Sequence, residues 1–379
     1  MTIHDCSAAF DAAPFSLMPH FLSLHDPRRE HGKLHPLEDI LVLTICAVIC
    51  GADSFVAIEA FGHAKHDFLR RFLALPNGIP SHDTIRTVFT RLDPRHFEQC
   101  FLNWVNAVFE RTAGKLVAID GKTLRRSYDR TSKKAALQMV SAWASTNRLV
   151  LGQVQVDATS NEITAIPKLL EVLDVSGCIV TIDAMGCQQD IAAQIIDQGG
   201  DYVLAVKANQ GSLFTEVHQC FADIEAEGMC FYETEEQRHG REETRWYWMT
   251  ETLPWPLRRI QWKGLRSMGV VEASRTVGAK YTVERRYYIS SLPADAQQLA
   301  EAVRGHWHIE NQLHWVLDVA FREDESRIRT GHADANMAVV RRIALNLLKQ
   351  DTSVKLGIAN KRLKAGWDEA YLLRILLQE

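Results

Sequence analysis

The chain has 379 residues, a formal net charge of −4 and a pI near 6.4. With 46% hydrophobic and 24% charged residues it is long enough for two or three packed domains, which excludes a disordered chain. The net charge excludes a broadly basic surface, so any contact with nucleic acid must come from local patches. The N-terminus lacks a signal-peptide pattern, and the longest apolar run, Ile40–Cys50, is too short to span a bilayer. Together with eight scattered cysteines that form no CxxC motif, this predicts a cytoplasmic protein with reduced thiols and no membrane segment.

Residues 1–112 carry the pattern of a helical domain. A long apolar stripe covers Leu37–Ala60. Farther on, a glycine-containing turn with good N-cap residues precedes an amphipathic helix predicted over Thr84–Leu92, and Arg86 and Arg91 lie off its apolar face. Two helices around such a turn, with exposed arginines, fit a helix-turn-helix that contacts DNA. An ordinary helical bundle explains the same pattern, and both interpretations stay open.

Two short apolar runs end at an aspartate that glycine follows closely. Leu116–Ile119 ends at Asp120, and the β-branched run in Cys178–Gly186 ends at Asp183. Such runs are typical of strands buried on both faces, and the ends of such strands are the usual place for chemistry in open α/β sheets. If the two strands are parallel neighbours, their carboxylates meet at one sheet edge, where repulsion calls for a cation. Oxygen ligands favour Mg²⁺ or Mn²⁺ over zinc, although Asp120 taken alone is equally well explained as a turn residue.

From residue 113 onward the pattern alternates between strands and helices. Two strands are predicted over Ala136–Ser145 and Leu149–Val156, followed by a helix over Asn161–Leu173. The second aspartate strand, another helix and a strand over Tyr202–Val206 complete the series. A three-stranded meander, followed by two parallel strands added on the other side of the first strand, is the ribonuclease H-like order.

Basic residues gather close to the two predicted aspartate strands. Lys207 follows the last strand of the series, and a basic turn follows the first. The turn contains Lys122, Arg125, Arg126, Arg130, Lys133 and Lys134. Beside a carboxylate metal site these cations suit a polyphosphate backbone, and a solvated loop is the alternative.

Residues 211–285 do not continue the strand–helix alternation and predict a mostly β insertion. A long helical pattern returns over Ala294–Leu317 and carries Glu310 among apolar and aromatic neighbours. This setting favours a functional glutamate, with a buried ion pair to histidine or arginine as the alternative. Zinc is rejected, because His306 and His314 are two helical turns apart and cannot both reach one ion with good geometry.

The ordered motifs resemble those of bacterial insertion-sequence DDE transposases, in the H-repeat-associated (ISAs-type) branch. The resemblance covers nearly the whole chain, including the N-terminal segment Gly78–Pro94. The motifs are Ile119-Asp120-Gly121-Lys122, Thr181-Ile182-Asp183-Ala184-Met185, Val206-Lys207-Ala208-Asn209-Gln210 and His306-Trp307-His308-Ile309-Glu310-Asn311 with Leu313–Val319. The resemblance implies a ribonuclease H-like core, a β insertion before the glutamate helix, and strand transfer on double-stranded DNA with two Mg²⁺ or Mn²⁺ ions.

By matching position, the resemblance makes Asp120, Asp183 and Glu310 the catalytic, metal-binding carboxylates. The residues expected to contact this DNA are the basic ones of the turn, the strand end and the N-terminal helix, namely Lys122, Arg125, Arg126, Lys207, Arg86 and Arg91. One departure concerns the tyrosine, arginine and lysine that many relatives carry around the glutamate. Their places are taken by Val303, His306 and Leu317, so phosphate gripping falls to other groups, with Arg304, His314, Arg322 and Arg327 as candidates.

The expected plan has four parts. It comprises a DNA-end-binding helical domain over 1–112, a first half of the catalytic core over 113–210, the insertion over 211–285, and the glutamate helix with a helical tail over 286–379. Pairing of two element ends implies a homodimer. A related metal-dependent nuclease and a domesticated DNA-binding protein without transposition are the alternative functions, and the presence of all three carboxylates counts against the latter.

Overall fold

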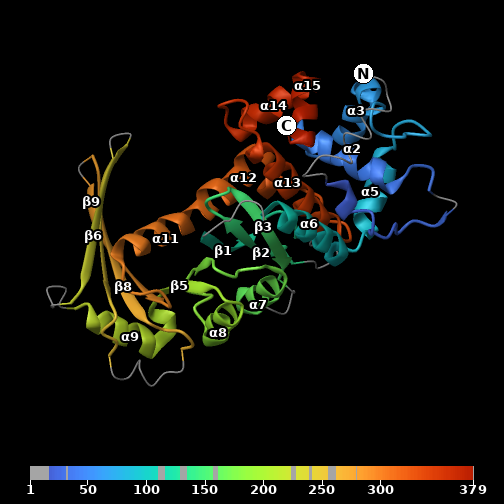
Figure 1. Ribbon diagram of the computed structural model, residues 1–379. Coiled ribbons are helices and arrows are strands. Elements are labelled where there is room, and N and C mark those ends of the chain that lie inside the picture. The colour runs from blue at the N-terminus through green and yellow to red at the C-terminus, as the bar shows by residue number, and fades with distance from the viewer. Residues whose placement is uncertain are drawn as a thin grey trace.

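The computed structural model describes residues 17–30, 33–109, 116–128, 135–156, 161–222, 228–238, 241–254, 262–278 and 280–378. Figure 1 shows three regions in space. The helices of the two chain ends gather at one side, a strand–helix core lies in the middle, and long strands project at the opposite side. Helix α11 (Ala296–His308) runs from the long strands back to the core.

A single mixed sheet of nine strands organises the described residues, in the order β3-β2-β1-β4-β5-β9-β8-β7-β6. Its strands are β1 (Leu116–Thr123), β2 (Gln138–Ala144), β3 (Leu149–Gln155), β4 (Ile179–Ile182), β5 (Asp201–Val206), β6 (Cys230–Arg238), β7 (Arg241–Thr250), β8 (Ser267–Val277) and β9 (Lys280–Ser290). The first three form an antiparallel meander, and β4 and β5 add in parallel on the other side of β1. The predicted ribonuclease H-like order is thus confirmed.

Strand β1 extends farther than the sequence predicts. Its parallel pairing with β4 ends at Ile119, but its antiparallel pairing with β2 continues through Asp120 to Thr123. The expectation that the strand stops at Asp120 was therefore wrong, because a glycine does not end a strand that keeps a partner along one edge. Asp120 nevertheless lies where the parallel pairing of β1 with β4 ends, and this position places its side chain at the site.

In its described residues the predicted β insertion begins with helix α9 (Gly211–Cys220), and four strands follow. Strands β6 to β9 form an antiparallel meander, and β9 pairs with β5 of the core. The insertion is therefore a continuation of the core sheet, and the expected boundary at residue 285 falls inside β9.

Helices cover the core sheet on both faces. Helix α7 (Glu162–Val172) packs on β2 and β3, α8 (Gln189–Asp197) on β5, and α11 on β1, β4 and β5. Neighbouring residues of a strand point to opposite faces. Gly121 faces the Glu162 carboxylate of α7, so the preceding Asp120 faces the α11 side.

The N-terminal helices are α2 (Leu37–Ile49), α3 (Phe55–Ala64), α4 (His66–Leu69), α5 (His82–Arg91) and α6 (Pro94–Phe109), after a short 3₁₀ turn at Met18–His20. The predicted stripe over 37–60 is interrupted between α2 and α3. Gly51 adopts φ +103°, and the Ser54 side chain caps α3 by accepting from the Ala57 N–H at 3.2 Å. Nearly every residue of α2 is buried, so the stripe marks a core helix.

The C-terminal helices are α12 (Trp315–Phe321), α13 (Ala333–Gln350), α14 (Ile358–Trp367) and α15 (Glu369–Leu377), with the short 3₁₀ turn η5 (Glu323–Glu325) between α12 and α13. Helix α13 is buried along most of its length and packs against α2, α5 and α6. Asn336 of α13 donates to the carbonyls of Phe89 and Leu92 at 2.8 and 3.0 Å. The two ends of the chain therefore share one core, which we call the helical body (residues 37–109 and 333–377).

No helix among the described residues is long and apolar enough to cross a membrane. Among the described residues, Cys46, Cys50, Cys100, Cys187, Cys220 and Cys230 are present as thiols.

Candidate functional site

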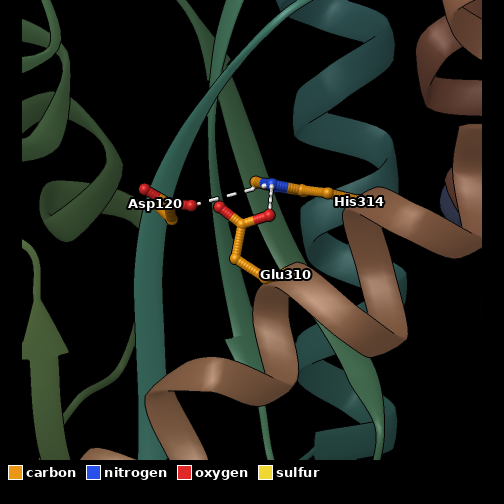
Figure 2. A group of neighbouring side chains, drawn as sticks. All are labelled: Asp120, Glu310 and His314. Atoms are coloured by element: carbon orange, nitrogen blue, oxygen red, sulfur yellow. Dashed lines mark ion pairs between the residues drawn. The ribbon is translucent and has the colours of Figure 1, made fainter. Parts of the chain in front are cut away.

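Three side chains converge where β1 and β4 diverge (Figure 2). Asp120 comes from β1, whereas Glu310 and His314 lie one turn apart on the π-helix η4 (Ile309–His314), which joins α11 to α12. His314 Nδ1 lies 3.7 Å from Asp120 Oδ2 and 3.7 Å from Glu310 Oε2. One ligand atom from each residue lies within 4.8 Å of the others, a spacing that suits a shared metal ion.

Asp183 follows β4 and lines the same cavity. Its Oδ1 accepts from the backbone N–H groups of Met185 and Gly186 at 3.0 and 3.3 Å, which fixes the carboxylate in the turn. The cavity of about 250 Å³ is lined by all three predicted carboxylates, Asp120, Asp183 and Glu310. The structure thus brings the three residues together from segments far apart in the sequence.

The carboxylates repel one another strongly. Burial, together with the negative charges of Glu310 and Asp183, raises the pKa of Asp120 to about 8. The hydrogen bond with His314 lowers the pKa of Glu310 to about 2, so this side chain keeps its charge. A buried carboxyl held protonated by its neighbours favours the binding of a cation, which removes the repulsion.

His306 lines the cavity one turn before Glu310. Its Nδ1 lies 3.1 Å from the Thr181 hydroxyl on β4, and burial lowers its pKa, so the ring is neutral near pH 7. Among the described residues the group with metal-ligand spacing contains His314 and not His306.

Two further groups near the site were not expected there. For His314 the sequence suggests a zinc ligand, which is rejected, or a phosphate contact, although its position four residues after Glu310 is the signal that could place it beside the carboxylates. Its Nε2 is buried without a hydrogen-bond partner among the described residues. Glu162 of α7 lies against Gly121, and burial, with the charge of Asp183, raises its pKa. No motif in the sequence marks Glu162.

The expected DNA-contacting residues take different positions. Lys207 is exposed at the cavity, and Arg126 is exposed beyond β1. Arg125 is also exposed, with its Nε 3.3 Å from Asp324 Oδ2. Lys122 is only 9% exposed and donates to a backbone carbonyl and a carboxylate within the protein, so its contact with DNA stays a prediction. The remaining cations of the basic turn, Arg130, Lys133 and Lys134, lie outside the described residues.

Arg86 and Arg91 are both exposed on α5, which precedes in sequence all of the residues that line the cavity. Arg86 pairs with Asp83 one turn earlier at 2.8 Å, an exposed pair that DNA can displace at little cost. Helices α3 and α5 are in contact, with α4 and the glycine-containing turn between them in sequence, and this packing is compatible with a helix-turn-helix and with a bundle.

The acidic residues that follow Glu310 in the chain form ion pairs with other groups. Asp318 forms an ion pair with Lys122, Asp324 with Arg125, and Glu325 with Arg322. Glu323 is buried beside Arg342. Within this part of the chain Glu310 lines the cavity with Asp120 and Asp183, and its role as the third carboxylate stays a prediction.

A ribonuclease H-like sheet with a carboxylate cluster at the divergence of β1 and β4 defines a class of enzymes that transfer phosphoryl groups of nucleic acids. Residues 18–105 match the family DDE_Tnp_1-associated, and residues 111–347 match the family Transposase DDE domain. The chain therefore belongs to the DDE transposase family and is a DNA transposase.

Curated relatives are similar over nearly their full length. The chain is 43% identical to the "H repeat-associated putative transposase YhhI" of Escherichia coli K12, with 95% of this chain and 97% of the relative covered. It is also 43% identical to the "Putative transposase YncI" of Escherichia coli O157:H7, with 94% and 93% covered. A solved structure of a piggyBac transposase synaptic complex with hairpin DNA aligns with a TM-score of 0.43 and 10% identity, with 99% of this chain and 81% of that chain covered.

Proposed function

We propose that this transposase cuts and rejoins DNA strands at the ends of an insertion sequence, using two Mg²⁺ or Mn²⁺ ions held by Asp120, Asp183 and Glu310. The observation that carries the proposal is the single cavity lined by the three carboxylates. Family membership supports the dependence on a divalent metal and the action on DNA.

The donor set fits such ions. Carboxylate oxygens are the preferred ligands of Mg²⁺ and Mn²⁺, and an imidazole is better tolerated by Mn²⁺ than by Mg²⁺. Asp120 interacts electrostatically with both of the other carboxylates, because the charges of Glu310 and Asp183 each raise its pKa. Asp120, Asp183 and Glu310 would hold the ions, and His314 lies close enough to Asp120 and Glu310 to join them. When bound, a pair of ions activates the attacking hydroxyl and stabilises the leaving oxygen in an in-line displacement at phosphorus.

The chain's own residues orient the reactants. Neutral His306, held by Thr181, can donate or accept a hydrogen bond at the cavity without adding charge. Exposed Lys207 offers a cation to the DNA backbone at the cavity, and Arg125 and Arg126 offer two more beyond β1. We further propose that Arg86 and Arg91 contact the element ends and that two copies of the chain pair the two ends.

The test is a cleavage and strand-transfer assay with the full chain, duplex DNA carrying the inverted repeats beside the gene, and a supercoiled target. We expect 3′-hydroxyl ends and their joining to the target with Mn²⁺ or Mg²⁺, and no products in excess chelator. Cleavage without joining, under conditions that preserve paired ends, would assign the protein as a nuclease. Products formed in excess chelator would contradict the metal site.

A further inference from the structure

Lys122 follows Asp120 by two residues on β1, so both side chains lie on the same face of the sheet. The Lys122 ammonium is directed toward the π-helix. It donates to the backbone carbonyl of His314 at 3.3 Å and to the Asp318 carboxylate, and it lies 3.7 Å from Glu323 Oε2. One buried lysine on the strand of Asp120 thus contacts the helical segment that carries Glu310 and His314.

The partners of Lys122 are anchored in turn by the helical body. Glu323 is 1% exposed and accepts from Arg342 Nη1 at 2.9 Å, with Arg341 Nη1 at 3.7 Å. Arg342 also donates to the Ala338 carbonyl, and Arg341 to the Ser326 hydroxyl, both at 3.0 Å. We call Lys122, Asp318, Glu323, Arg341 and Arg342 the charge chain. It joins β1 to the π-helix, to α12 and η5, and finally to α13.

Stability alone gives little reason for such an arrangement. Burying several charges costs solvation energy that their mutual attraction often only balances, and well-packed apolar residues commonly replace them without loss. A π-helix is a less regular segment than an α-helix and is frequently found at functional sites. Its position relative to β1 decides whether Asp120, Glu310 and His314 can meet one ion, and Lys122 links the two segments directly.

We propose that Lys122 is a positioning residue that holds the π-helix against β1, so that Glu310 and His314 meet Asp120 at the distance required for a divalent ion. The inference rests on the proposed metal-dependent function and adds a role for Lys122 and its counter-ion Asp318. It replaces the direct contact between Lys122 and DNA phosphate that the sequence favours.

Removal of Lys122 should leave the fold intact. Glu323 keeps two arginine partners, and the Asp318 side chain is 34% exposed, so that water can solvate its carboxylate. The test variant is Lys122→Met, which preserves length and removes the ammonium. The matched control is Lys355→Met, the same change at an exposed lysine. Asp318→Asn is a second, nearly isosteric variant that removes the same ion pair. It replaces Lys122→Met in the test if Lys122→Met fails to fold.

Two measurements on the full chain distinguish positioning from DNA contact. The first is Mn²⁺ affinity without DNA, followed by electron paramagnetic resonance. The second compares kcat for cleavage with Kd for end DNA at several salt concentrations. Residues that orient metal ligands typically change metal affinity or activity by about 10- to 100-fold, and we expect losses of this size for Lys122→Met in Mn²⁺ affinity and kcat. The DNA Kd and its salt dependence should match those of the parent and of Lys355→Met.

A double variant adds a further check. Because Lys122 and Asp318 act through one ion pair, Lys122→Met with Asp318→Asn should lose no more Mn²⁺ affinity than Lys122→Met alone. If the losses of Mn²⁺ affinity in the two single variants add fully in the double variant, Lys122 and Asp318 do not act through one ion pair. Parental Mn²⁺ affinity in Lys122→Met, with a weaker DNA Kd and a salt slope reduced by about 0.9, would identify a phosphate contact and overturn the proposal. If Lys122→Met weakens Mn²⁺ binding but the parent cuts no DNA, the result supports the positioning role of Lys122 and contradicts the proposed reaction.

Discussion

Glu323 provides a quantitative test of the charge chain through the pH dependence of stability. Although burial alone would raise it, the pKa of the Glu323 carboxyl is lowered from 4.5 to about 2 by the charges of Arg342, Lys122 and Arg341. A carboxyl whose folded pKa lies below its unfolded value stabilises the protein above the unfolded pKa, and this contribution disappears as the pH falls toward the folded pKa. A depression from 4.5 to about 2 corresponds to about 3 kcal/mol at neutral pH.

The perturbation is Glu323→Gln, which keeps the size of the side chain and leaves Arg342 buried without its carboxylate partner. We expect a loss of about 3 kcal/mol in the free energy of unfolding at pH 7, near the lower end of the roughly 3–5 kcal/mol typical for breaking a buried ion pair. The loss should shrink progressively below about pH 4.5, where the parent carboxyl begins to gain its proton in the unfolded chain.

The assay is equilibrium urea unfolding of parent and variant at a series of pH values from 7 down to the lowest at which the parent remains folded. Glu325→Gln is the control, because the Glu325 side chain is 54% exposed and its pair with Arg322 is screened by water. A destabilisation that stays constant from pH 7 into the acid range would refute the electrostatic argument. A free energy of unfolding at pH 7 that is the same for Glu323→Gln and Glu325→Gln would also refute it.

Two further predictions concern the site and the DNA contacts. Glu310→Gln should retain DNA binding but lose cleavage by orders of magnitude, whereas Glu301→Gln on the exposed face of α11 should cut normally; a metal-dependent nicking assay compares them, and normal cutting by Glu310→Gln would move the third carboxylate elsewhere. Arg86→Ala with Arg91→Ala should weaken binding to element ends and reduce its salt slope by roughly 0.9 for each phosphate that the variant no longer neutralises, as measured by fluorescence anisotropy. Unchanged binding would favour the plain helical bundle over the helix-turn-helix.

The core of the fold could be predicted because its signals are local. Short β-branched runs ending in aspartate mark strands buried on both faces, and their order along the chain fixes a meander followed by parallel additions. The pairing of β9 with β5 could not be predicted, because strand pairing depends on which sheet edge is free and not on the pattern within either strand. For the same reason the insertion was expected as a separate unit.

The candidate site was predictable only in part. Asp120, Asp183 and Glu310 stand at positions where a strand end or an unusual helix setting gives a signal. Glu162 gives no such signal, because its proximity to Gly121 arises from the packing of α7 on the sheet. Lys122 was assigned from its charge alone, and its burial depends on Asp318 and Glu323, which lie about two hundred residues away in sequence.

The organisation of the helical body changes how the N-terminal region must be tested. A chain that starts near residue 113 would lack the helices that cover α13, whose apolar residues include fully buried Val340, Ile343 and Leu348. Each such side chain brought into water costs roughly 1.5–3 kcal/mol, while a folded domain is stable by only about 5–15 kcal/mol. We therefore expect this truncated chain to aggregate or to lose cooperative unfolding, measured by size-exclusion chromatography and thermal circular dichroism. A monodisperse fragment that unfolds cooperatively would contradict the shared core. Only in that case could its DNA affinity be compared with that of the full chain.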